Sequence, residues 1–362
     1  MSTPLSRRAF CQVLGHTPLV GAAAATSSAT MASKAAATES GKRSPTLPPA
    51  TNLAAPGEVP RRRFGNTDAV VAALGLGGHT FAKAKTKREA IRIIHEAIDG
   101  GITFMDNAWD YHDGRSERLM GEALVGRRDQ VFLMTKVCSH GRSASVAMTQ
   151  LEQSLKRLRT DRLDLWQIHE VAYENDPDLH FAAGGVTEAL LKAREQGKVR
   201  FLGFTGHKSP ALHLRMLGHG FPFDSVQMPL SGFDASFRSF EQEILPLLIR
   251  RGIAPIGMKS LNGNAAAIKA GVITAEQALR YAMSLPVATT VSGMDSLKWL
   301  RHNLRVARGF VPMTPREMQE HRDRCAGYAK DGRFELYKVS IQFEGAEGRK
   351  QHGFPAESKT EA

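Results

Sequence analysis

Residues 87–107 read Lys-Arg-Glu-Ala-Ile-Arg-Ile-Ile-His-Glu-Ala-Ile-Asp-Gly-Gly-Ile-Thr-Phe-Met-Asp-Asn, and this stretch contains the unit that decides the fold. Its first part, 87–99, repeats apolar residues at helical spacing and predicts an amphipathic helix. The pair Gly100-Gly101 is typical of a helix end. The apolar run 102–107 then predicts a buried strand. A helix that leads into a buried strand is what a parallel sheet requires.

The same alternation continues along the chain. Apolar or β-branched runs predict eight strands, at 70–76, 102–107, 131–137, 163–169, 199–205, 225–228, 253–258 and 288–291. Amphipathic patterns between them predict helices at 87–99, 144–158, 187–196, 241–250, 274–284 and 297–308. Eight strands that alternate with helices within roughly 240 residues favour a single-domain α/β fold, the (β/α)8 TIM barrel.

An open, doubly wound sheet is the rival architecture. Such a sheet carries a Gly-x-Gly-x-x-Gly turn after its first strand. Here the first predicted strand ends in Gly75-Leu76-Gly77-Gly78-His79, which breaks that spacing. The closed barrel is therefore the expected fold, and its predicted span is 63–310.

The composition indicates an ordinary globular protein. The chain has 362 residues, of which 42% are hydrophobic and 23% charged, with a formal net charge of +12. Its Lys and Arg residues are scattered, and no nucleic-acid-binding motif is present, so we expect no nucleic-acid partner. The three cysteines, Cys11, Cys138 and Cys325, share no close spacing. We therefore predict neither a disulfide framework nor a metal site.

The N-terminus has the layout of an export signal. Arg7-Arg8 precede a short, weakly apolar segment, 11–25, and a region of small residues. This order is typical of a twin-arginine signal, and the segment is too short for a stable membrane span. We predict a signal peptide over 1–35, with cleavage between Ala25 and Ala37, the twin-arginine export machinery as partner, and a periplasmic or otherwise exported location. A basic tail is the alternative.

Two further segments flank the predicted barrel. Residues 36–62 are rich in Ala, Ser, Thr and Pro and lack hydrophobic periodicity, so they are interpreted as a linker. Residues 311–362 form a C-terminal extension in which one helix is predicted, over 315–326. The last fifteen residues are polar and rich in Gly, Lys and Glu, and the sequence predicts that they are disordered.

Polar residues stand where several predicted strands end. Asp106 ends the second strand, with Tyr111 in the loop beyond it, Lys136 ends the third, and His169 ends the fourth. In a barrel these ends meet at one mouth. There an ammonium would lower the pKa of a tyrosine, a carboxylate would hold the ammonium, and a histidine would contact the substrate oxygen. The group would supply a general acid for an oxygen that gains negative charge, with hydride coming from a cofactor.

These residues also carry a family resemblance. The run Gly101-Ile-Thr-Phe-Met-Asp-Asn-Ala-Trp-Asp-Tyr111 resembles the aldo-keto reductase signature, Gly-x-x-x-x-Asp-x-Ala-x-x-Tyr. The stretches Leu133–Lys136 and Leu163–His169 resemble the same family. The resemblance implies a catalytic tetrad, consisting of Asp106, Tyr111, Lys136 and His169. It also implies reduction of a small aldehyde or ketone to an alcohol with NADP as cofactor, NAD being possible.

The resemblance further implies a set of cofactor-binding residues, which are Thr205, Gly206, His207, Gln227, Met258, Lys259, Ser260, Gly293, Met294 and Asn303. The set departs from the family pattern at several positions. Thr205-Gly206 replaces a Ser-Asn pair that holds the carboxamide, and Met258 replaces a stacking aromatic ring. Gly293 and Trp299 fall where NADP-using members carry basic residues, which leaves NAD open.

Substrate contacts are expected from loops and from the C-terminal tail. The candidates are His79, Phe81, Trp109, His140, Tyr173 and His180. Two other functions stay open: a non-catalytic, cofactor-sensing partner subunit, and a metal-dependent hydrolase that uses histidines at the same strand ends. The hydrolase would need a His-x-His pair on the first strand, where His79 is the single histidine.

Overall fold

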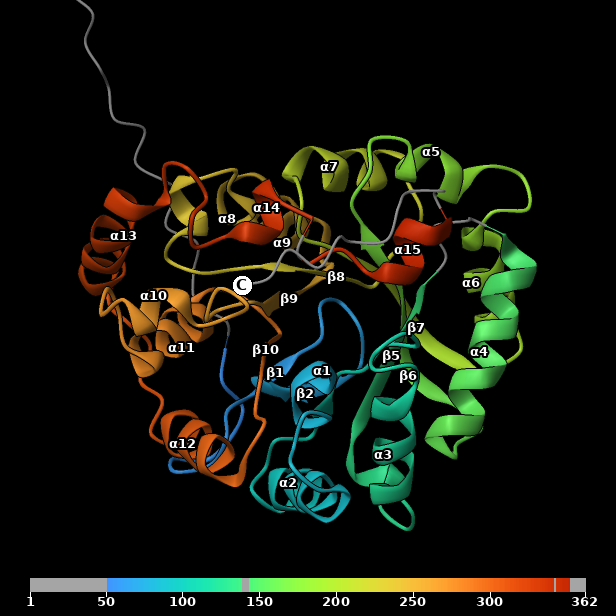
Figure 1. The fold of residues 1–362 in the computed structure, drawn as a ribbon, viewed down its shortest axis with the longest axis horizontal. Helices are drawn as coiled ribbons and strands as arrows, with labels where there is room; N and C mark the ends of the chain where they lie inside the picture. Colours follow the sequence, from blue (N-terminus) through green and yellow to red (C-terminus); the bar gives the residue numbers. More distant parts are fainter. Residues whose placement is uncertain (1–50, 139–142, 342, 352–362) are drawn as a thin grey trace, which may run out of the picture. The chain divides into compact units, whose positions relative to one another are not determined.

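The computed structural model describes residues 51–138, 143–341 and 343–351, and within them eight parallel strands close into a barrel in the order β10-β3-β4-β5-β6-β7-β8-β9 (Figure 1). This confirms the predicted fold. The barrel strands are β3 (Leu74–Leu76), β4 (Phe104–Met105), β5 (Phe132–Cys138), β6 (Leu163–Val171), β7 (Val199–Gly206), β8 (Ser225–Pro229), β9 (Ala254–Met258) and β10 (Thr289–Ser292).

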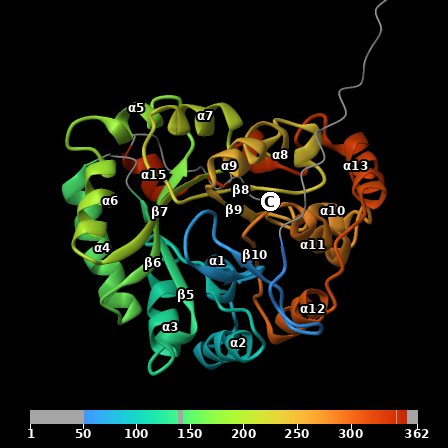
Figure 2. The same ribbon diagram turned by 180° about the vertical axis from the view of Figure 1, so that it is seen from behind.

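Helices surround the barrel on its outside (Figure 2). Those of the barrel region are α1 (Gly78–Phe81), α2 (Lys87–Asp99), α3 (Arg115–Ala123), η1 (Arg128–Gln130), α4 (Ala144–Leu158), α5 (Asp176–Phe181), α6 (Val186–Glu195), α7 (Pro210–Gly218), η2 (Asp234–Ser236), α8 (Phe240–Glu243), α9 (Leu245–Arg251), α10 (Ala266–Lys269), α11 (Ala275–Ser284) and α12 (Leu297–Arg308). No helix in the described ranges is long and apolar enough to cross a membrane.

The first predicted strand, 70–76, is in fact two strands. β2 (Val70–Ala72) pairs antiparallel with β1 (Arg61–Arg63), and only β3 joins the barrel. The buried Arg62 guanidinium donates to the carbonyl of Val287 at 3.0 Å and to that of Met283 at 2.7 Å. The folded region therefore begins before residue 63, the predicted start of the barrel, because these long-range bonds fix a segment that has no hydrophobic periodicity.

The β1–β2 hairpin brings Phe64 to one end of the barrel. Phe64 is fully buried, with its ring centroid 5.0 Å from that of Phe132 and 5.7 Å from that of Phe201. These rings belong to one apolar cluster, together with Met134, Leu165 and Ile256 among others. A separate and larger cluster joins strand residues to helix residues such as Ile94. The barrel therefore has a filled interior and an outer core, as expected for this fold.

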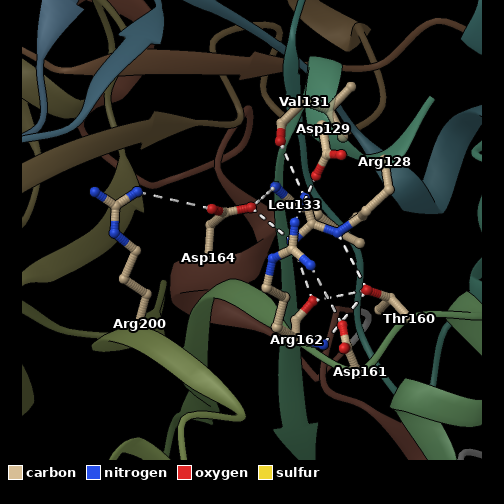
Figure 3. Close-up of polar contacts among 9 residues, drawn as sticks. All are labelled: Arg128, Asp129, Val131, Leu133, Thr160, Asp161, Arg162, Asp164 and Arg200. Atoms are coloured by element: carbon tan, nitrogen blue, oxygen red, sulfur yellow. Dashed lines mark hydrogen bonds and ion pairs between the residues drawn. The ribbon is translucent and has the colours of Figure 1, made fainter.

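An ionic network ties together the beginnings of β5, β6 and β7 (Figure 3). The Asp164 carboxylate accepts from the backbone N–H of Leu133 at 2.8 Å and from the Arg128 guanidinium at 2.8 Å. Arg200 approaches the other carboxylate oxygen at 4.0 Å. Asp164 lies at the start of β6 and His169 near its end, so this network lies at the opposite end of the strands from the predicted site.

Two other predictions about helices need revision. The span 241–250 contains two helices, α8 and α9, because Pro246 has no N–H to bond to the preceding turn. The C-terminal extension contains three helices where one was predicted: α13 (Pro315–Ala329), α14 (Leu336–Val339) and α15 (Ala346–Gln351). Most of the last fifteen residues, which were predicted to be disordered, lie at 352–362, outside the described residues. At the start of this stretch the prediction is wrong, because residues up to Gln351 belong to helix α15.

Candidate active site

Three neighbouring strands, β4, β5 and β6, and the loop after β4 bring the four predicted catalytic residues together. Asp106 directly follows β4, Tyr111 lies in the loop after it, Lys136 is on β5, and His169 is on β6. The buried Lys136 ammonium contacts the Asp106 carboxylate and donates to the carbonyl of Asn107 at 2.8 Å. The same nitrogen lies 3.4 Å from the Tyr111 hydroxyl oxygen. The ring centroids of Tyr111 and His169 are 5.6 Å apart, edge to face.

The loop that carries Tyr111 is held on both sides. The backbone N–H of Trp109 donates to the carbonyl of Lys136 at 3.0 Å, and Arg157 on α4 donates to the carbonyl of Trp109 at 2.8 Å. The Arg157 guanidinium also bridges to the buried Glu117 at 3.1 Å. These bonds fix the loop against β5, so the Tyr111 hydroxyl faces the Lys136 ammonium.

The electrostatics of Tyr111 differ from the sequence-based expectation. Desolvation raises the pKa of Tyr111 well above its ordinary value of 10.0, and the carboxylates of Asp106, Asp110 and Glu170 raise it further. In the protein alone the net shift of this pKa is therefore upward, opposite to the lowering that was expected from Lys136. Asp106 offsets the positive charge of Lys136, and the other two carboxylates were not part of the predicted site.

His169 lies between those two additional carboxylates. Its Nδ1 atom is 3.2 Å from an Asp110 oxygen, and its Nε2 atom is 3.9 Å from a Glu170 oxygen. Burial opposes ionisation of Asp110, but the adjacent imidazole, a backbone hydrogen bond and the Lys136 ammonium together outweigh burial and lower the pKa of that carboxyl. Burial raises the pKa of Glu170 to about 7, although His169 acts in the opposite direction. Glu170 is visible in the sequence beside His169, whereas no sequence pattern singles out Asp110.

The C-terminal extension crosses the same mouth, where Figure 1 shows α15 beside β7 and α5. The backbone N–H of Gly345 donates to Glu170 at 3.0 Å. The carboxylate of the neighbouring Glu344 accepts from Tyr173 at 2.6 Å, from Lys208 at 2.8 Å and from Arg349 at 3.0 Å. A Cβ added to Gly345 would lie 3.3 Å from Asp110. The extension is therefore a wall of the site, as the sequence predicted in general terms.

The comparisons with known proteins show the family of the chain. The family model described as "Aldo/keto reductase family" matches residues 73–270. The chain belongs to the aldo/keto reductase family. It is accordingly an NAD(P)H-dependent oxidoreductase, and the family reduces carbonyl groups. The comparisons support neither the cofactor-sensing subunit nor the hydrolase, and the described residues include no cluster of three potential metal ligands.

Several relatives of this aldo/keto reductase are bacterial. It is 25% identical to the oxidoreductase YqkF of Bacillus subtilis, over 68% of this chain and 90% of that protein. It is 30% identical to a 6-dehydroglucose reductase of Novosphingobium aromaticivorans, over 56% of this chain and 69% of that protein. It is 36% identical to the methylglyoxal reductase YeaE of Escherichia coli, over 37% of this chain and 45% of that protein.

Solved structures resemble the fold. The holo form of an aldo-keto reductase from Bacillus halodurans, AKR11C1, matches with a TM-score of 0.63 and 24% identity. The match covers 99% of that chain but 76% of this one. At this identity the likeness concerns the fold alone. About a quarter of the present chain lies outside the match.

The residues expected to hold the nicotinamide carboxamide fit that group. Thr205 and Gly206 end β7, His207 follows, and Gln227 is on the adjacent β8. The Oε1 atom of Gln227 and the Nε2 atom of His207 are buried without a hydrogen-bond partner among the described residues. A carboxamide offers both a donor and an acceptor for such atoms. Gly206 is required sterically, because a Cβ there would lie 2.5 Å from the carbonyl of Val171.

The residues after β9 face the same mouth. Met258 ends that strand half-buried, and Ser260 is buried. Lys259 has a left-handed backbone, φ 54°, and its Nζ atom lies 5.1 Å from the ring centroid of Tyr337 and 4.7 Å from that of Phe343. Burial lowers the pKa of Lys259 to about 8. Both rings come from the C-terminal extension, which therefore also covers the expected cofactor side.

The residues after β10 that were expected to bind the cofactor make hydrogen bonds within the protein. Gly293 directly follows the strand. Met294 is fully buried in the outer core, and its N–H donates to Thr80 at 3.1 Å. The Asn303 amide donates to Ser292 at 3.1 Å and is buried. The Met294 side chain therefore packs in the core, and the Asn303 amide is used in a hydrogen bond within the protein.

The substrate-side candidates divide into two groups. His79 lies beside Tyr111, with ring centroids 5.4 Å apart, and Tyr173 contacts Glu344. Phe81 and His180 are fully buried, in the core and in α5, and are not loop residues. Trp109 turns toward α4, where its ring N–H donates to Gln153 at 2.7 Å. His140 lies outside the described residues.

Proposed function

We propose that this enzyme reduces a small, polar aldehyde or ketone to an alcohol, with Asp106, Tyr111, Lys136 and His169 as its tetrad. The single observation that carries the proposal is the position of the Tyr111 hydroxyl, 3.4 Å from a buried ammonium and beside the His169 ring. A tyrosine with a raised pKa keeps its proton at neutral pH, so a proton is available for the substrate oxygen.

A bound, reduced nicotinamide supplies a hydride to the carbonyl carbon. As the C=O π electrons move to the oxygen, the Tyr111 hydroxyl transfers its proton to that oxygen, and the product is an alcohol. The Lys136 ammonium stabilises the phenolate that is left, and this phenolate recovers a proton from solvent. His169 donates a hydrogen bond to the same oxygen. Gln227 and His207 would hold the carboxamide, with Met258 against the ring.

The cofactor is proposed to be NADP. Lys298 in the first turn of α12 is exposed and could meet a 2′-phosphate, whereas Arg301 is paired with Glu96 at 3.0 Å. Asp295 near the same turn would repel a phosphate, which favours NAD instead. Titration of protein fluorescence with NADPH and with NADH decides between the two. Tighter binding of NADH would reverse the assignment, and binding of neither would contradict the proposed function.

The substrate class is supported by the polar mouth and by two relatives. Asp110 and Glu170 are near Tyr111, Lys259 is near Glu170, and the His79 ring lies beside the Tyr111 ring. These polar and charged side chains favour a small substrate that carries further polar groups. The relatives are a methylglyoxal reductase and a 6-dehydroglucose reductase, both named for oxygen-rich carbonyl compounds. Reduction of short dicarbonyls and aldoses, compared with apolar aldehydes of equal length, tests this class.

The decisive test of the mechanism is Tyr111→Phe. Loss of the proton donor is expected to lower kcat by about 10²–10⁴-fold, because general acid catalysis contributes that much. Affinity for NADPH should be unchanged, since the ring remains. Near-normal turnover of Tyr111→Phe would refute the assignment of the donor.

We propose further that the chain is exported by the twin-arginine machinery to the periplasm or beyond. The support is the sequence around Arg7-Arg8 and the Ala-rich region after it, which lie outside the described residues. Replacement of both arginines by lysine should leave the precursor in the cytoplasm, as cell fractionation would detect. Continued export of that variant would remove the basis for this proposal.

A further inference from the structure

The C-terminal extension crosses the barrel mouth between two attachment points, of which the first is α14. The Lys338 ammonium of this helix lies 2.6 Å from Asp234 in η2 and 3.0 Å from Glu335. The Lys338 and Asp234 side chains are both 0% exposed, and the Tyr337 hydroxyl donates to Glu335 at 2.8 Å. Separating such a buried ion pair leaves uncompensated charges, so α14 is a fixed anchor.

The second attachment point is Glu344, farther along the mouth. Its carboxylate accepts from Tyr173 beyond β6, from Lys208 beyond β7 and from Arg349 in α15. The Lys208 ammonium also donates to the carbonyl of Ser340 at 2.8 Å, and its side chain is 23% exposed. Water can therefore replace protein partners at this attachment more easily than at the buried ion pair of α14, so this is the end that can open.

Between the two attachment points, aromatic rings of the extension cover residues that the cofactor is expected to meet. The Tyr337 ring centroid lies 5.7 Å from that of His207. The Lys259 ammonium lies 5.1 Å from the Tyr337 centroid and 4.7 Å from the Phe343 centroid. Phe343 also packs on the turn after β9, because a Cβ added to Gly263 would lie 2.9 Å from its ring. The extension therefore covers the expected cofactor side at the ends of β7 and β9.

Polar atoms of the covered residues and of their neighbours are buried without partners. The Nε2 atom of His207 and the Oε1 atom of Gln227 have no hydrogen-bond partner among the described residues. The same holds for both amide atoms of Asn262, which is 1% exposed. Asn262 belongs to the covered turn, where its backbone N–H donates to the carbonyl of Lys259 at 2.8 Å. Buried polar atoms are rarely left unpaired, so this set indicates a place for a polar ligand.

We propose that the C-terminal extension gates cofactor exchange: the nicotinamide cofactor binds between the extension and the ends of β7, β8 and β9, and it enters and leaves when the Glu344 attachment opens while α14 stays in place. The proposal rests on the proposed function, since it uses the NAD(P)H site at these strand ends. It gives the extension control over the rate of cofactor exchange, in addition to the wall that it forms beside Glu170.

A gate of this kind has a kinetic signature. When opening precedes both entry and release, a weaker attachment raises the association and the dissociation rate constants by the same factor, and their ratio, Kd, stays the same. A segment that only contacts the bound cofactor would change the dissociation rate constant alone. A segment that occupies the empty site would change the association rate constant alone. The two rate constants therefore separate a gate from a ligand contact and from a plug.

The test compares Glu344→Gln with Glu320→Gln in the full-length protein. Glu320 lies on α13 of the same extension and pairs with Arg316 at 2.8 Å on the exposed surface, so its replacement removes a similar ion pair away from the mouth. Stopped-flow fluorescence gives the rate of NADPH binding and of its displacement by excess NADP⁺. Both rate constants should rise about 10-fold in Glu344→Gln, the factor that the loss of one hydrogen bond between charged groups would produce, and Kd should stay nearly constant. Glu320→Gln should behave as the wild type.

Tyr173→Phe is the second variant, because it weakens the same attachment from the barrel side and keeps the ring. It should raise both rate constants by a smaller factor, and it decides the question if Glu344→Gln does not fold. A rise in only one rate constant would overturn the gate. So would faster hydrogen exchange in 343–351 with unchanged rate constants, since the attachment would then open without limiting exchange.

The outcomes also separate this proposal from the proposed function. Tight NADPH binding with rate constants that neither variant changes would overturn the gate and leave the proposed function intact. If the titration shows that NADH binds more tightly, the same measurements are made with NADH. Binding of neither nucleotide to the wild type would overturn the proposed function and the gate together.

Discussion

The Nζ atom of Lys136 lies 3.4 Å from the hydroxyl oxygen of Tyr111, and the same ammonium contacts the carboxylate of Asp106. The ammonium therefore has two functions in one position. It neutralises a buried carboxylate, which is a requirement of folding, and it faces the proposed proton donor. Substitutions at this position should affect stability and rate together, but the two effects can be separated.

Lys136→Met should lower the free energy of unfolding by about 3–5 kcal/mol, because Asp106 would remain buried without its cation. The double variant Lys136→Met/Asp106→Asn should recover part of that loss, since no unpaired charge is left. Denaturant titration measures the free energy of unfolding of the single and the double variant. Reduction rates should remain low in both variants, because each lacks the ammonium beside Tyr111. Equal stability of the single and double variants would show that the pair contributes little to folding.

Glu170→Gln should change the pH dependence of stability. The folded-state pKa of Glu170 is about 7, above its ordinary value of 4.5, so the folded protein binds more protons than the unfolded chain between these two values. Stability from this group is therefore complete below the lower pKa and is lost as pH rises through the upper one.

A glutamine at position 170 does not ionise, so it removes this loss of stability, and it can still accept the hydrogen bond from the N–H of Gly345. The variant should gain stability relative to the wild type between about pH 5 and about pH 8. Thermal unfolding at both pH values measures the gain, and the exposed Glu195→Gln is the control. Parallel pH profiles for wild type and Glu170→Gln would contradict the assignment.

Lys338→Met should release the C-terminal extension. The Lys338 ammonium is fully buried, 2.6 Å from Asp234 in η2 and 3.0 Å from Glu335. Its removal leaves two buried carboxylates unpaired, and the expected cost is about 3–5 kcal/mol. Lys330→Met, at an exposed position of the same extension, is the control. Denaturant titration gives the cost, and unchanged stability would mean that the extension is held mainly by apolar contacts.

Glu344→Gln should loosen the segment over the mouth without unfolding the barrel. The carboxylate accepts bonds from Lys208, Tyr173 and Arg349, and the two cations lose their ion pairs in the variant. Hydrogen exchange of amides in 343–351 should become faster, while exchange in β5 and β6 stays slow. Unaltered exchange in 343–351 would indicate that Gly345 and Phe343 suffice to hold the segment.

The fold and the proximity of the four proposed tetrad residues could be predicted from the sequence because both depend on local patterns. Apolar runs that alternate with helical periodicity define parallel strands, and parallel strands in a barrel all end at one mouth. Asp106, Lys136 and His169 each follow or end such a run, so their meeting follows from the topology. The break between β2 and β3 was missed, because a continuous apolar run does not reveal that its two halves pair with different strands.

What only the tertiary structure decided is the surroundings of these groups. The contact of Gly345 with Glu170 joins residues 175 positions apart, and no periodicity predicts it. The same holds for Asp110, whose place beside Nδ1 of His169 depends on how a loop is fixed against α4 and β5. The direction in which the pKa of Tyr111 is shifted also depends on burial and on the neighbouring carboxylates. The sequence by itself determined which groups meet at the mouth, whereas their charges and pKa values depend on distances and desolvation that only the folded chain defines.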